Sequence, residues 1–142
     1  MQRNITFQAQ DVNFVLPKKQ IIRNWITAVA GNEAFKTGPI NFIFCSDAHL
    51  LEINKQYLNH DYFTDIITFD YTEGKRLAGD IFISLDRVAD NATEYKAQFD
   101  DELHRVIIHG ILHLMGYKDK SAADEKQMRQ KENGALSLLK SL

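Results

Sequence analysis

The sequence has 142 residues, 44% of them hydrophobic and 25% charged, which predicts one compact domain over residues 1–142 and excludes a disordered or fibrous chain. Its 17 basic and 19 acidic residues give a formal net charge of −2, so any contact with nucleic acid is expected to be local. There is no apolar run long enough to span a bilayer, no signal-peptide pattern at the start and only one cysteine. We therefore expect a cytoplasmic protein without disulfides or a membrane contact.

The first part of the chain is expected to alternate between strands and helices. Residues 4–16 are strand-like, and apolar residues then recur at helical spacing from Pro17 until Gly31, where a helix is expected to end. Residues 40–45 (INFIFC) predict a short apolar strand, and Ser46 can cap the helix that follows it. A helical crossover joins these two strands, so they are expected to be parallel.

The rest of the chain predicts a hairpin followed only by helices. Residues 65–71 (DIITFDY) and 79–84 (GDIFIS) are rich in β-branched and aromatic residues and are expected to pair as antiparallel strands. Helices are expected from Asp86 onward, and the last begins at Ser121, where S-A-A-D is a weak capping box. The predicted fold class is α+β, a small mixed sheet of about four strands with about five helices packed against it.

One helix, over residues 103–115, is predicted to be mostly buried and to carry a single polar stripe. Its aliphatic residues cover most of the helical wheel, whereas His109 and His113 share the polar sector. Side chains four residues apart lie on one helical face, so the two imidazoles can bind one metal ion. Gly116 permits a left-handed turn that ends the helix and brings Asp119 back toward the histidines as a third ligand.

Three alternatives remain open for the pattern of His109, His113 and Asp119. Histidine pairs at this spacing also occur in helices without a metal, hydrogen-bonded to their neighbours. The spacing from His109 to Asp119 matches the zinc-binding run of metzincin proteases, but there a glutamate general base follows the first histidine, and here that position is Gly110. A metalloprotease is therefore the less favoured alternative. The third is a non-catalytic RNA-binding assembly factor with a structural metal, although structural zinc sites normally have four protein ligands.

Three segments resemble one known family. Residues 109–120 (HGILHLMGYKDK) resemble the H-G-x-L-H-L-x-G-Y-D-H signature of the YbeY endoribonucleases. Residues 53–71 and residues 79–84 are similar to two further motifs of that family, in the same order. The resemblance implies a single-strand-specific, metal-dependent endoribonuclease of rRNA maturation and ribosome quality control, usually with Zn²⁺. It also implies the small ribosomal subunit or its assembly factors as partners, and not DNA.

The sequence departs from the family at two positions. Asp119 stands where the family usually has a third histidine, and aspartate is an ordinary zinc ligand. We therefore expect His109, His113 and Asp119 to hold one Zn²⁺, with another divalent metal as the alternative, that activates water or polarises a phosphoryl oxygen of RNA. Leu58 stands where the family has a basic residue, and an arginine there would suit a clamp on the scissile phosphate.

Several other residues are candidates for the reaction or for RNA binding. Arg105, on the histidine stripe, and His60, in a polar loop, are candidate catalytic residues. Lys118 and Lys120 flank Asp119 and are candidate RNA-binding residues, each with the alternative of a solvated surface charge. Asp65, next to Thr64, is expected first to be a local turn residue.

Overall fold

The computed structural model of the protein describes residues 4–142. Its elements in chain order are β1 (Ile5–Ala9), α1 (Lys19–Gly31), β2 (Lys36–Cys45), α2 (Asp47–Leu58), β3 (Ile66–Asp70), β4 (Arg76–Ser84), α3 (Leu85–Glu94), α4 (Phe99–Leu114) and α5 (Ala122–Lys140). The four strands and five helices of this range confirm the predicted α+β class. No helix between residues 4 and 142 is long and apolar enough to cross a membrane.

The strands form one mixed sheet in the order β1-β2-β4-β3. β1 runs parallel to β2, and β2 runs parallel to β4. The parallel pairing of the first two strands is as predicted, since α1 provides the crossover between them. β3 is antiparallel to β4, which confirms the hairpin, and it forms one edge of the sheet.

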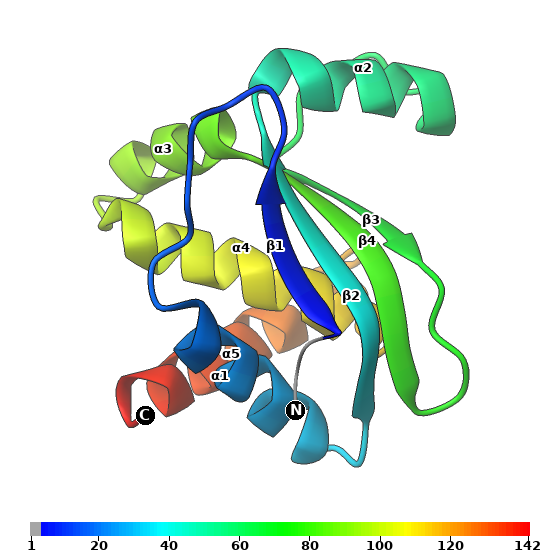
Figure 1. Ribbon diagram of the computed structural model, residues 1–142, viewed down its shortest axis with the longest axis vertical. Coiled ribbons are helices and arrows are strands. Elements are labelled where there is room, and N and C mark those ends of the chain that lie inside the picture. The colour runs from blue at the N-terminus through cyan, green and yellow to red at the C-terminus, as the bar shows by residue number, and fades with distance from the viewer. Residues whose placement is uncertain (1–3) are drawn as a thin grey trace.

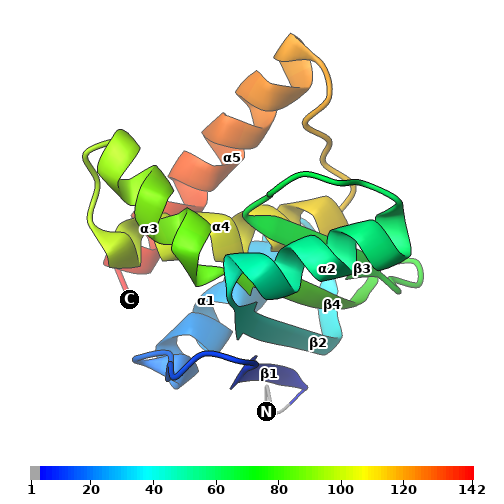
Figure 2. The same cartoon turned by 90° about the horizontal axis from the view of Figure 1, so that it is seen from above.

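Most of the helices are layered on one face of the sheet. α1 and α4 pack on one face (Figure 1), and α5 packs against both of these helices. Figure 2 shows α5 on the far side of α4 from the strands. The main core lies between these layers and includes Trp25, Phe42, Ile81, Ile107 and Ile111. α2 lies across one end of the sheet, where a smaller cluster is formed by Cys45, Leu50, Ile53 and Ile67.

Gly110 lets α4 lie close to the sheet. A Cβ added at this position would lie 3.0 Å from Ile66 Cδ1 and 3.1 Å from Ile81 Cδ1, tighter than an ordinary van der Waals contact. Position 110 therefore faces the core. A larger side chain at this position would have to displace Ile66 and Ile81.

The first strand is shorter than predicted, because β1 ends at Ala9 and not near residue 16. Asp11 has a φ of +54°, and its carboxylate accepts a hydrogen bond from the backbone N–H of Ser46 at 3.1 Å. Phe14 packs edge-on against Phe44, with ring centroids 5.2 Å apart. The apolar residues that resembled a strand therefore belong to a loop that covers the core, and contacts distant in sequence end the strand.

Candidate metal centre and cleft

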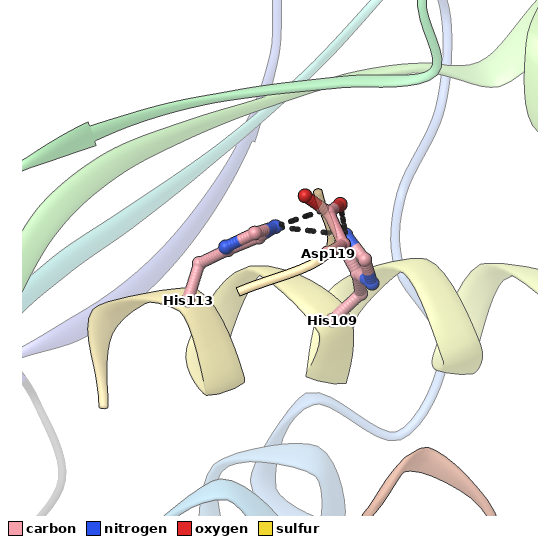
Figure 3. Close-up of side chains that lie close together, drawn as sticks. All are labelled: His109, His113 and Asp119. Atoms are coloured by element: carbon pink, nitrogen blue, oxygen red, sulfur yellow. Dashed lines mark hydrogen bonds and ion pairs between the residues drawn. The ribbon is translucent and has the colours of Figure 1, made fainter. Parts of the chain in front are cut away.

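The predicted metal ligands come from the last turns of α4 and the loop after it. His109 and His113 lie one turn apart, and α4 ends at Leu114. Gly116 has a φ of +101°, a conformation that favours glycine, and the chain turns back there. Figure 3 shows the Asp119 carboxylate beside both imidazoles, so the turn predicted from Gly116 brings the three side chains together.

The spacing of the donor atoms suits one metal ion. The Nε2 atoms of His109 and His113 lie 3.0 Å apart, and Asp119 Oδ2 lies 3.3 Å from each of them. Ligands of a tetrahedral zinc ion, each about 2.0 to 2.1 Å from the metal, stand about 3.3 Å from one another. The three residues therefore fit a divalent metal with little movement of their side chains.

A buried carboxylate on α5 holds the first histidine. His109 Nδ1 donates a hydrogen bond to Glu132 Oε2 at 2.7 Å, and the Glu132 side chain is only 5% exposed. Because an ionised carboxylate only accepts hydrogen bonds, this contact places the proton on Nδ1 and leaves the Nε2 lone pair for a metal. Carboxylates behind metal-binding histidines commonly fix the ring and its tautomer in this way.

Glu132 was missed from the sequence, since it lies 23 residues from His109. One feature of the sequence could have indicated that Glu132 is buried. Met128 and Ala135 are buried on α5, and Glu132 shares their helical face at spacings of four and three residues. An acidic residue on the buried face of an amphipathic helix requires a partner, which here is a histidine of another helix.

The charges around His109 favour a cation. Burial acts to lower the pKa of His109, but the hydrogen bond and charge of Glu132, together with Asp119 and Asp65, outweigh burial and raise that pKa. Burial acts to raise the pKa of Glu132, but hydrogen bonds from His109 and Arg105 outweigh it and lower the pKa of this carboxyl. Positive charge is therefore stabilised at the imidazole, whether a proton or a metal supplies it.

Arg105 lies behind the metal donors, against α5, and is not among the residues that line the cleft. Its Nη1 atom lies 3.0 Å from Glu132 Oε1 and 3.1 Å from Asn133 Oδ1. This placement favours a supporting role over the predicted catalytic one, because the guanidinium is held by the carboxylate that also holds His109. The helical stripe correctly put Arg105 on the side of the histidines, but the packing of α5 covers its end of the stripe.

The three donors lie at one side of a cleft of about 480 Å³ that follows β3. The opposite wall contains Leu58, His60 and Tyr62, which lie at the end of α2 and in the segment after it. His60, a candidate from the sequence, thus shares the cleft with the metal ligands. Lys118 and Lys120 are exposed on either side of Asp119 and are not among the residues that line this cleft.

Asp65 also lines the cleft, although its sequence context suggested a turn residue. Its carboxylate accepts a hydrogen bond from Asn91 Nδ2 at 3.3 Å, and its backbone oxygen accepts one from the N–H of Ser84. Burial raises the pKa of Asp65, and the positive charge of His109 opposes that shift. Asp65 therefore adds a partly desolvated carboxyl group to the metal side of the cleft.

Comparison with known proteins identifies relatives along almost the whole chain. The family model described as Endoribonuclease YbeY matches residues 4–140. Proteins named Endoribonuclease YbeY are similar to it in Parabacteroides distasonis, with 52% identity over 135 residues and 95% of each chain, and in Cytophaga hutchinsonii, with 48% identity over 140 residues and 98% of each chain. A solution structure from Thermotoga maritima has a TM-score of 0.68 at 26% identity and covers 95% of this chain and 88% of its own. The chain belongs to the YbeY endoribonuclease family.

Proposed function

We propose that the protein is a zinc-dependent endoribonuclease that cuts single-stranded RNA in the cleft beside His109, His113 and Asp119. The convergence of these three donors on one point, with Glu132 behind the first of them, is the observation that carries the proposal. Bound zinc would supply an activated water molecule or polarise a phosphoryl oxygen. Three protein ligands are typical of catalytic zinc, whereas a purely structural site in an assembly factor normally has four.

The chain's own residues account for the rest of the proposed site. Glu132 orients His109, and Arg105 holds Glu132 in place, so both are positioning residues. Lys118 and Lys120 are proposed to contact the RNA backbone outside the cleft, since both are exposed beside Asp119.

The substrate and setting follow from the family to which the chain belongs. The relatives are named endoribonucleases, and we propose ribosomal RNA as the substrate, in rRNA maturation and ribosome quality control. The partners would then be the small ribosomal subunit or its assembly factors in the cytoplasm. Single-stranded RNA suits the cleft, because unpaired bases can enter a site that follows the edge of a sheet.

A metalloprotease is the second candidate, and one observation favours it. β3 is an edge strand beside the metal centre, and edge strands can pair with an extended peptide. Gly110 argues against it, since glycine cannot act as the general base that follows the first histidine in metzincin proteases, and Ile66 and Ile81 leave no room for a larger side chain there. RNA cleavage is therefore the better supported activity.

A comparison of substrates tests the proposal. Protein stripped of metal by a chelator, and the same protein reloaded with zinc, would be incubated with an unstructured RNA, a duplex of that RNA and casein. We expect only the zinc-loaded protein to act, and only on the unstructured RNA. Cleavage of casein would favour the protease, and intact RNA in the presence of zinc would contradict the proposed function.

A further inference from the structure

Two aromatic rings in the wall opposite the metal donors stack on each other. The rings of His60 and Tyr62 have centroids 5.0 Å apart and planes inclined by 22°, and Tyr62 Oη lies 2.9 Å from His60 Nδ1. Both residues line the cleft, yet Tyr62 is 55% exposed. A tyrosine buried for stability would be covered, so this pair leaves a large aromatic surface available to a ligand.

A buried side chain holds the segment that carries the two rings. Asn54 is 1% exposed, and its Nδ2 atom donates a hydrogen bond to the backbone oxygen of Tyr62 at 2.9 Å. Its own backbone oxygen accepts a hydrogen bond from the N–H of His60 at 3.1 Å. Asn59, the residue directly before His60, takes the left-handed conformation with a φ of +55°. The backbone that carries the rings is therefore positioned before any ligand binds, which reduces the entropy lost on binding.

The charge of the cleft limits how it can bind RNA. No lysine or arginine of the described chain is among its lining residues, and its carboxylates are Asp65, Asp70 and Asp119. Inside the cleft, side chains therefore do not neutralise phosphates, and contacts to bases must supply affinity there. Stacking on an aromatic ring suits this need, since it strengthens binding by roughly 5- to 150-fold per base with any base.

We propose that His60 and Tyr62 form a stacking site for one unpaired base of the RNA in the cleft that holds the metal donors. This inference rests on the proposed function and deepens it, because the stacked base positions its strand for cleavage. A base in a regular duplex already stacks on its neighbours and is not free to occupy the site. The pair therefore gives the enzyme a physical reason to prefer single strands.

Binding of an RNA that resists cleavage tests the site. The zinc-loaded protein would be titrated into a fluorescein-labelled 2′-O-methyl oligonucleotide, with anisotropy as the readout and a gel to confirm that the strand stays intact. We expect Tyr62→Ala to bind about tenfold more weakly, and Tyr62→Phe, which keeps the ring, to bind within about twofold of the parent protein. Tyr95→Ala is the matched control, since Tyr95 is 61% exposed at the end of α3 and should not affect binding.

The main result of a second arm is obtained with the parent protein alone. In a series of oligonucleotides with one abasic position each, the parent protein should lose affinity at one position in particular, and Tyr62→Ala should not discriminate among them. Uniform affinity across the series, or equal binding by Tyr62→Ala and the parent, would overturn the stacking site. If the parent still cuts unstructured RNA, the proposed function stands without it. If the parent neither binds nor cuts RNA, both proposals fail.

Discussion

The two walls of the cleft differ in how their side chains are supported. On the metal side, the His109 side chain is 20% exposed and is held by Glu132, which is 5% exposed. On the opposite side, Tyr62 is 55% exposed, and its ring contacts the exposed ring of His60, while Asn54 anchors the backbone of the segment. Metal coordination requires fixed donors, whereas recognition of a flexible strand requires accessible surface. Changes on the metal side should therefore abolish function, and changes on the opposite side should alter it by degrees.

The largest effect is expected at Asp119. The Asp119→Ala variant should lose most of its metal and its RNA cleavage, because two histidines remain as ligands. Asp119→His should keep the metal, since an imidazole nitrogen is also a zinc ligand and reaches a similar distance. Elemental analysis of both variants, with circular dichroism to confirm folding, makes the comparison. Full metal content in folded Asp119→Ala would reduce Asp119 to a turn residue.

An intermediate effect is expected behind the metal. Glu132→Gln keeps a hydrogen-bond acceptor for His109 but removes the charge, and we expect metal affinity to fall by about 10- to 100-fold. Zinc titration against a competing chelator measures the change. Glu125→Gln is the matched control, because Glu125 is exposed on the same helix, α5. Equal losses in the two variants would show that general charge, and not the contact with His109, is responsible.

A smaller effect should appear in the pH dependence of stability without metal. Burial acts to lower the pKa of His109, but Glu132 outweighs it, so the pKa is raised in the folded protein. The resulting stabilisation is fully present below the unfolded value of about 6.5 and is lost as pH rises through the raised pKa. Thermal unfolding at pH 6 and pH 8 should show a larger advantage at pH 6 in the parent protein than in Glu132→Gln. The same pH difference in both proteins would contradict this assignment.

The smallest effect is expected on the opposite wall. Leu58 is 41% exposed at the end of α2, so Leu58→Arg can place a guanidinium in the cleft without disturbing the core. We expect cleavage of unstructured RNA to become faster by roughly two- to tenfold, because the arginine can contact a phosphate. Initial rates at saturating zinc measure this, with Leu58→Gln as the uncharged control. A slower Leu58→Arg enzyme would show that the apolar side chain itself contributes to binding.

The metal side of the cleft could be predicted because local rules determine it. Helical periodicity puts His109 and His113 on one face, and Gly116 allows the turn that returns Asp119 to them. Glu132 and Tyr62 depend on contacts made only after folding. The first requires α5 to pack against α4, and the second requires the segment after α2 to be held by Asn54.

The same difference between local rules and long-range contacts decided which parts of the fold could be predicted. The hairpin and the parallel crossover followed from strand patterns and from short connections between neighbouring elements. The predicted end of β1 was wrong, because the contact between Asp11 and Ser46 joins residues 35 positions apart and leaves no signal in the local sequence. Arg105 was placed on the correct helical stripe, but the helix that covers it could not be inferred from that stripe.

Stoichiometric zinc titration tests the central claim most directly. The cleavage rate of an unstructured RNA would be measured as zinc is added to metal-free protein, to His109→Ala and to His49→Ala, which removes a histidine of α2 outside the site. We predict that the parent and His49→Ala rise linearly to a break at one zinc per chain, and that His109→Ala shows no cleavage. Cleavage without zinc, or an undiminished rate in His109→Ala, would contradict the assignment of the reaction to this metal centre.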